Sequence, residues 1–168
     1  MAQAEPFHFD GFYAGGHFGY MDVDAGFGSG SGTMGGLQAG YNAVNGNFMW
    51  GVEFDFSLTD ASPCCDIDVG PIATLRPRIG YAVDNWLLYV TGGIASVQIE
   101  DFDAFDGTYG WTLGAGVERM VGDIVGVKLE YRYMRFDDLE QGLLSPPASS
   151  SGDDFEMHTI MAGVNFHF

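Results

Sequence analysis

Hydrophobic and polar residues alternate with a period of two along eight segments of the chain, a pattern typical of β-strands with two unlike faces. Glycine, β-branched and aromatic residues are frequent in these segments and favour strands over helices. Each segment has about the length that a tilted strand needs to cross a bilayer. The segments span residues 11–21, 34–42, 48–58, 72–82, 86–99, 109–120, 124–136 and 155–168.

The connections between these segments alternate in length. Short connections with turn residues occupy 44–47, 83–85 and 121–123, and long ones occupy 22–32, 59–70, 100–107 and 137–154. Because successive strands reverse direction, all short turns then lie at one end, together with both termini. The sequence therefore predicts an all-β fold, an eight-stranded antiparallel transmembrane β-barrel with up-and-down topology. Its short turns and termini would be periplasmic, and its long loops extracellular.

The two faces of the predicted strands differ in charge. In the segment 48–58, for example, Phe54 and Phe56 alternate with Glu53 and Asp55. Four of the segments together carry four acids and four bases on the face opposite the apolar one: Glu53, Asp55, Arg76, Arg78, Glu118, Lys128, Glu130 and Arg132.

The balance of these charges indicates which face points inward. On a surface in water they would need no balance, whereas in a narrow lumen each must be paired, because an unpaired buried charge is very costly. An eight-stranded barrel has room for side chains but not for an open channel. We therefore expect a salt-bridged lumen and a lipid-facing exterior. The alternative is a soluble β-sandwich or barrel whose charged face is solvated.

Three residues depart from this pattern. Pro77 lies in mid-segment and should mark a bulge or a position where no N–H is needed. Arg119 and Arg135 fall on the apolar face but near its two ends, where long side chains can extend to the membrane surface.

The overall composition agrees with a barrel and excludes other classes. The 168 residues include 26 glycines, and 23 acids against 6 bases give a formal charge of −17, which excludes a general nucleic-acid-binding protein. No charge-free apolar run approaches the length of a transmembrane helix. We expect residues 1–10 to be a periplasmic lead and 11–168 a single barrel domain. The start, MAQAEP, lacks the features of a signal peptide and is expected to be a mature end with an added Met.

Several stretches resemble a known family: FDGFYAGGHFGY, GGLQAGYN, LRPRIGYAVDNWLLYVTGGIA, YGWTLGAGVERMV, VKLEYRYMRF and HTIMAGVNFHF. They are similar to the small opacity-like or porin-like outer-membrane β-barrel proteins of alphaproteobacteria, which share the architecture of OmpA/OmpX-type barrels. The resemblance implies insertion by the barrel assembly machinery and contact with outer-membrane lipid and lipopolysaccharide. It also implies an assembly signal at the C-terminus, matched by Gly163, Phe166 and Phe168, although Met161 stands where a polar residue is usual.

Two of the long connections contain candidate metal ligands. Cys64 and Cys65 are adjacent and close to Asp66 and Asp68, so they could bind a soft metal, form a vicinal disulfide, cross-link chains, or be an incidental pair. The acidic segment 100–107 lacks the spacing of a calcium-binding loop, so a solvated display of carboxylates is favoured there and weak binding of divalent cations is the alternative.

The histidines and hydroxyl residues offer little for catalysis or haem binding. Hemin ligation needs an accessible histidine beside an apolar slot, and His8, His17, His158 and His167 show no obvious partner. The nearest candidate for a nucleophile and base is Thr159 beside His158, but adjacent residues of a strand face opposite ways, so the sequence shows no convincing triad. We expect neither an enzyme nor a resident cofactor.

The sequence thus favours a structural or interaction protein that supports envelope integrity or surface contact. Three alternatives remain open at this point: a binding module for hemin or a divalent metal, a narrow pore of low conductance, and a lipid-modifying enzyme.

Overall fold

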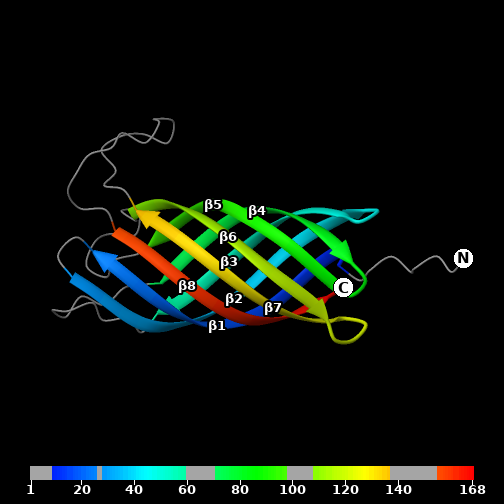
Figure 1. Cartoon of the computed structure of the whole chain (residues 1–168), viewed down its shortest axis with the longest axis horizontal. Coiled ribbons are helices and arrows are strands. Elements are labelled where there is room, and N and C mark those ends of the chain that lie inside the picture. Colours follow the sequence, from blue (N-terminus) through cyan, green and yellow to red (C-terminus); the bar gives the residue numbers. More distant parts are fainter. Residues whose placement is uncertain (1–8, 26–27, 60–70, 98–107, 137–154) are drawn as a thin grey trace, which may run out of the picture.

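The computed structural model describes residues 9–25, 28–59, 71–97, 108–136 and 155–168. Eight strands form one closed barrel in which every strand pairs antiparallel with its neighbours in chain order, and β8 returns to pair with β1 (Figure 1). The strands are β1 (Gly11–Ala25), β2 (Gly28–Asn45), β3 (Phe48–Thr59), β4 (Ile72–Val83), β5 (Trp86–Val97), β6 (Thr108–Met120), β7 (Val125–Phe136) and β8 (Phe155–His167). No helix among the described residues is long and apolar enough to cross a membrane. The predicted fold class is confirmed.

The prediction of a loop over residues 22–32 was wrong. β1 and β2 continue into a long hairpin, and Ala25 still pairs with Gly28. The physical reason is that Met21 and Val23 point into the barrel and continue the alternation beyond the predicted end of the strand. The partner strand β2 consists here of glycine and serine, so its sequence shows no alternation of apolar and polar residues. Its backbone nevertheless pairs with β1 residue by residue.

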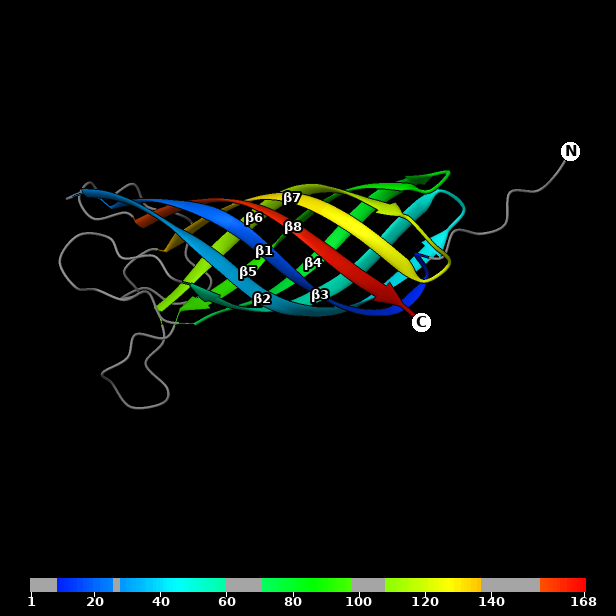
Figure 2. The ribbon, with the colours of Figure 1, turned by 90° about the horizontal axis from the view of Figure 1, so that it is seen from below.

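The short turns gather at one end of the barrel. Figures 1 and 2 show the C-terminus at the same end as the β2–β3, β4–β5 and β6–β7 connections. Gly46 has a φ of 63° in the β2–β3 turn, as tight hairpins require. The last residue is held in place there, because the Phe168 N–H donates to the carbonyl of Phe12 at 2.9 Å.

Large apolar side chains cover the outer wall. Leu37, for example, is 71% exposed and Trp50 is 56% exposed. An apolar surface this continuous is far larger than the patches on soluble monomers, so hydrocarbon rather than water must surround the wall. Other members are Phe12, Phe18, Val52, Phe54, Leu75, Ile79, Leu88, Val90, Leu113, Leu129, Ile160 and Phe166.

The interior contains three layers. A charged middle layer lies between two clusters of buried apolar side chains. The cluster toward the long connections comprises Met21, Val23, Ile72, Ala95, Met134, Phe136 and Met157. The cluster toward the short turns comprises Phe9, Met49, Ala82, Leu87, Tyr89 and Met120.

Inward-facing glycines make room for the large side chains of the lumen. A Cβ on Gly116 would lie 2.6 Å from the Tyr89 hydroxyl oxygen, and one on Gly40 would lie 2.5 Å from that of Tyr13. A Cβ on Gly93 would lie 3.1 Å from Arg76 Cγ. The high glycine content is therefore partly a steric requirement of filling so narrow a barrel.

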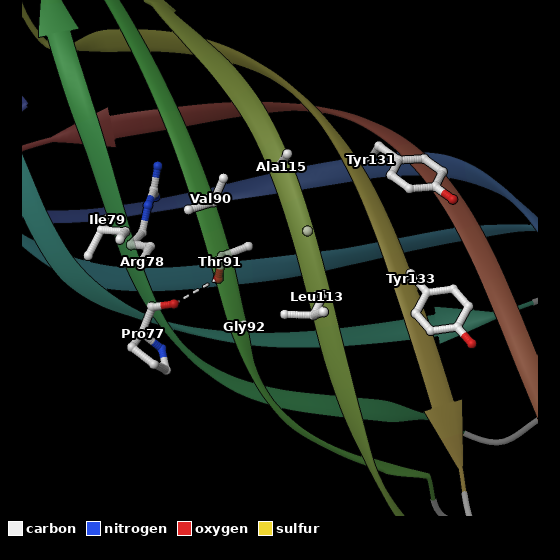
Figure 3. Close-up of a pocket in the computed structure, with 11 residues that line it drawn as sticks. Pro77, Arg78, Ile79, Val90, Thr91, Gly92, Leu113, Ala115, Tyr131 and Tyr133 are labelled. Atoms are coloured by element: carbon white, nitrogen blue, oxygen red, sulfur yellow. Dashed lines mark hydrogen bonds between the residues drawn. The ribbon is translucent and has the colours of Figure 1, made fainter. Parts of the chain in front are cut away.

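Pro77 interrupts the pairing of β4 with β5 without adding a residue. The pairs Leu75–Ile94 and Arg78–Thr91 share one register, but the two residues of β4 between them are not paired with β5. The Thr91 hydroxyl donates to the Pro77 carbonyl at 3.0 Å and partly replaces the lost contact (Figure 3). Of the two outcomes expected for Pro77, the structure shows an unpaired position and not a bulge.

We predict that Gly116→Ala destabilises the barrel by about 1–3 kcal/mol, because the new methyl group overpacks the space occupied by the Tyr89 ring. Urea unfolding in detergent, followed by tryptophan fluorescence, would measure the change. Gly122→Ala is the matched control, since a Cβ there meets nothing within 4 Å. Equal stability of the two variants would contradict the steric account.

Candidate functional site: the filled interior of the barrel

The structure places all eight charged residues singled out from the sequence inside the barrel. Strands β3, β4, β6 and β7 supply them, and none exposes more than 2% of its surface. They are Glu53, Asp55, Arg76, Arg78, Glu118, Lys128, Glu130 and Arg132. Four negative charges therefore face four positive charges within one enclosed layer.

Glu53 is one centre of this layer. It pairs with Arg76, and it accepts hydrogen bonds from Arg78 at 3.1 Å and from the Tyr13 hydroxyl at 2.7 Å. Lys128 Nζ lies 3.3 Å from the same carboxylate. Three cations thus converge on one anion, which must share them with other acids for the charge to balance.

Glu130 is the second centre and takes up the remaining positive charge. It accepts from Arg76 Nη1 at 2.5 Å, from Arg132 Nη2 at 3.0 Å and from the Tyr89 hydroxyl at 2.7 Å. Lys128 is 3.7 Å away. Arg76 therefore bridges the two centres across the barrel, and removing it would leave both carboxylates short of a partner.

Polar residues extend the network toward the long connections. Arg132 contacts Asp55 with both terminal nitrogens, at 3.2 and 3.5 Å. His17 Nδ1 lies 3.4 Å from Asp55 and 2.9 Å from Gln38 Oε1, and its Nε2 lies 2.9 Å from Ser57 Oγ.

A second extension reaches toward the short turns. Glu118 accepts from the Asn165 amide at 2.9 Å and from Arg78 at 3.4 Å, and His167 Nε2 lies 2.8 Å from it. The Tyr13 ring stacks on His167 with centroids 5.4 Å apart. The polar layer is thus continuous along the barrel and meets an apolar cluster at each end.

Ser57, His17 and Asp55 have the connectivity of an acyl-transfer triad, which the sequence did not reveal. Their burial argues against that role, because Ser57 and Asp55 have no exposed surface and His17 is also buried. The single hydroxyl hydrogen of Ser57 also has two possible acceptors, because Asp55 Oδ1 lies 3.1 Å and His17 Nε2 lies 2.9 Å from Ser57 Oγ. A substrate has no path to this oxygen, so we interpret the three residues as part of the packed polar layer.

The sequence pattern does not reveal the aromatic and apolar side chains that line the lumen. Tyr13 and Tyr89 occupy inward-facing positions of their strands. In the stretch WLLYV, however, the residues of both faces are apolar, so the sequence does not show which of them point inward. Methionine gives a clearer signal, because every methionine from Met21 onward is buried. Flexible unbranched side chains suit the irregular gaps of such an interior.

Both basic residues of the outer wall contact neighbours at its ends. The Arg119 guanidinium lies 5.1 Å from the centre of the Trp86 ring near the short turns. Arg135 lies 3.9 Å from Glu156 near the long connections. These contacts agree with the expected placement of long charged side chains at the edges of an apolar belt.

The candidate metal ligands Cys64, Cys65, Asp66 and Asp68 lie outside the described residues, as does the acidic segment 100–107. Within the described part of the chain, no group of three or more His, Cys, Asp or Glu residues could hold a metal ion.

Comparison with known proteins agrees with this architecture. The family described as an outer membrane protein beta-barrel domain matches residues 1–168. This chain belongs to that outer-membrane β-barrel family. A 22 kDa outer membrane protein of Rhizobium leguminosarum is 33% identical over 95% of this chain and 78% of its own length. A 25 kDa outer-membrane immunogenic protein of Brucella canis is 30% identical over 79% of this chain, which spans 64% of that protein.

Solved structures show the same fold at low sequence identity. Neisserial surface protein A covers 95% of this chain and 98% of its own, with a TM-score of 0.63 and 19% identity. The attachment invasion locus protein of Yersinia pestis covers 95% of this chain and 99% of its own, with a TM-score of 0.55 and 16% identity. The solved structures show the fold alone, whereas the family match and the relatives named above show that this family member is a bacterial outer-membrane protein.

We predict that Arg76→Ala destabilises the barrel by about 3–5 kcal/mol, because it leaves two buried carboxylates short of a partner. Chemical unfolding in detergent would measure the loss. Arg119→Ala serves as the control, since it removes an exposed arginine from the same protein and should cost under about 1 kcal/mol. Similar unfolding midpoints for both variants would show that the interior charges are not mutually stabilising.

Proposed function

We propose that this protein is a closed structural barrel that seals its own path through the outer membrane and presents its long acidic connections outside the cell. The observation that carries the proposal is the filled lumen, in which paired charges occupy the middle and an apolar cluster blocks each end. In this proposal the barrel is a stable scaffold that supports envelope integrity or surface contact, and it is neither a channel nor an enzyme.

The packing of the lumen supports the absence of a channel. An ion crossing the barrel would have to displace Phe9 and Met49 at one end and Met134 and Met157 at the other, all fully buried. Between these clusters each cationic side chain already contacts a carboxylate. A transient ion would have to break such contacts in a space with little water, which is energetically costly.

The relatives support surface presentation. The Brucella relatives are named outer-membrane immunogenic proteins. In this chain the long connections carry most of the acidic residues. Carboxylates gathered at one rim would attract divalent cations and basic partner surfaces, and would also contact the phosphates of lipopolysaccharide through bridging cations.

The C-terminal residues support insertion by the barrel assembly machinery. Phe166 and Phe168 point outward, with Phe168 77% exposed, and Gly163 points inward. An exposed side chain contributes little to packing, so its contribution would come from contact with lipid or with the machinery that receives the strand.

We predict that the purified protein in a planar lipid bilayer shows no steady conductance. A paired variant, Asp55→Ser with Arg132→Ser, keeps the charge balance but removes a carboxylate and a large arginine side chain from the lumen, so transient openings are expected. Steady ohmic conductance of the unmodified protein would contradict the closed-barrel proposal.

We further predict that Phe168→Ala lowers the yield of folded barrel in the outer membrane several-fold but leaves refolding into detergent unchanged. Phe18→Ala is the matched control, because it removes another outward phenylalanine, 64% exposed, away from the C-terminus. The heat-dependent gel shift of membrane fractions would count folded protein. Equal yields of the two variants would count against an assembly signal at the C-terminus.

A further inference from the structure

One member of the apolar cluster at the short-turn end comes from outside the barrel strands. Phe9 precedes β1, yet it has no exposed surface and clusters with Met49, Leu87 and Met120, which come from three different strands. Its ring also meets His167 of β8 edge to face, with ring centroids 5.8 Å apart. A side chain from the segment before β1 therefore helps to close this end of the barrel, the short-turn mouth.

The chain turns from the outer wall into the short-turn mouth at Gly11. Phe12 is 66% exposed on the outer wall, whereas Phe9 is fully buried, so the chain changes sides within three residues. Gly11 has a φ of 108°, which residues other than glycine rarely adopt, and a Cβ there would lie 2.7 Å from the carbonyl oxygen of Phe168. Glycine is therefore required for the chain to enter the mouth beside the C-terminus, where Figure 2 shows the start of β1.

Side-chain hydrogen bonds, not strand pairing, hold residues 9 and 10 in place. The Asp10 carboxylate accepts a hydrogen bond from the Val44 N–H at 2.8 Å, and the Phe9 carbonyl accepts one from the Asn42 side-chain amide at 3.1 Å. The pairing of β1 with its two neighbours begins only at Gly11 and beyond. Residues 9 and 10 can therefore leave the mouth without breaking any of the strand pairs that close the barrel.

The closed mouth leaves two buried polar atoms unsatisfied. Within the described part of the chain, Asn42 Oδ1 and His167 Nδ1 are buried and have no hydrogen-bond partner. Both belong to side chains that contact Phe9, through the Asn42 amide and the His167 ring. A buried polar atom without a partner costs free energy that contact with water restores. Closure by Phe9 thus buries an aromatic ring but removes water from two polar atoms, which narrows the free-energy difference between the closed and the open mouth.

The apolar cluster toward the long connections has no such member. All of its residues lie on strands of the barrel, as Met21 does on β1 and Met134 on β7. Opening that end would therefore require strands to separate or lumen side chains to repack. Of the two ends, the short-turn mouth is the one that a short flanking segment closes.

We propose that Phe9 is a releasable plug of the short-turn mouth, hinged at Gly11 and latched by Asp10, and that it opens this end while the strands stay paired. The inference rests on the proposed closed barrel and adds one state to it. In that state water reaches His167 and Asn42 from the short-turn side, while the apolar cluster at the opposite end stays shut.

Diethylpyrocarbonate labelling tests the plug, because this reagent carbethoxylates imidazole nitrogens that solvent can reach. The protein would be folded in detergent, labelled at neutral pH for increasing times and digested, and mass spectrometry would give the rate at each histidine. His167 reports on the short-turn mouth, whereas His17, buried in the polar layer toward the long connections, reports on opening of the whole barrel. The unfolded protein in urea gives the rate of a fully accessible imidazole at each position.

In the unmodified protein we expect His167 to react more slowly than in the unfolded chain but faster than His17, because release of the plug exposes only His167. Phe9→Ala should raise the rate at His167 about tenfold or more and leave the rate at His17 unchanged. Phe12→Ala is the matched control, because it removes an outward phenylalanine next to the hinge and should change neither rate. Equal rates at His167 and His17 in the unmodified protein, or equal effects of the two alanine variants, would overturn the proposal.

The latch provides a second test that leaves the Phe9 side chain in place. Asp10→Ala removes the acceptor of the Val44 N–H and should raise the rate at His167 several-fold, whereas Asp10→Asn keeps an acceptor oxygen and should label like the unmodified protein. Equal labelling of the two Asp10 variants would also overturn the proposal. This pair carries the test if Phe9→Ala does not fold.

Two further measurements separate failure of the plug from failure of the closed barrel. The heat-dependent gel shift shows whether each variant is still a folded barrel. Steady conductance of the unmodified protein in a planar bilayer would contradict the closed-barrel proposal, whereas equal labelling of His167 and His17 in a non-conducting protein would contradict the plug alone.

Discussion

The pairing of buried charges is the constraint on which the rest of this structure depends. Eight charged side chains are enclosed in a barrel too narrow for bulk water, and their attraction compensates for lost hydration only while each keeps its partners. Glu53 and Glu130 share Arg76 and Lys128. Their other cations are also shared, because Arg78 contacts Glu118 and Arg132 contacts Asp55, so neither carboxylate has a cation entirely its own. This sharing links opposite walls of the barrel and makes the lumen one cooperative unit.

Two other features follow from that constraint. Long side chains can meet across the lumen only if neighbouring strands leave space, so glycines such as Gly93 and Gly116 face inward beside them. The attraction within an ion pair is strongest where little water surrounds it, and the apolar clusters at the two ends exclude water from the charged layer. The interior therefore resembles a soluble protein's core in its layering, although its centre is ionic, while the apolar surface faces outward toward lipid.

Much of this architecture could be predicted from the sequence, because a period of two survives wherever one face is charged and the other apolar. The alternation gave no correct prediction where the two faces of a strand do not differ in polarity. In 22–32 glycine and serine hide the continuing hairpin, and in β5 (Trp86–Val97) both faces are apolar, so Tyr89 was not recognised as a lumen residue. The candidate charges could be grouped by face, but not matched into pairs. Which anion meets Arg76 depends on the stagger of strands across the closed barrel, and local sequence does not encode it.

A double-mutant cycle on Asp55 and Arg132 would measure how strongly the buried charges stabilise one another, because these side chains contact each other at 3.2 and 3.5 Å inside the barrel. Alanine would replace each residue singly and then both, with unfolding free energies measured in detergent. We expect a coupling energy of about 1.5 kcal/mol or more. The partly exposed pair Arg135 and Glu156, 3.9 Å apart, should show a coupling energy under about 1 kcal/mol in the same experiment. Additive effects of the two interior substitutions would contradict the claim that paired charges hold the barrel together.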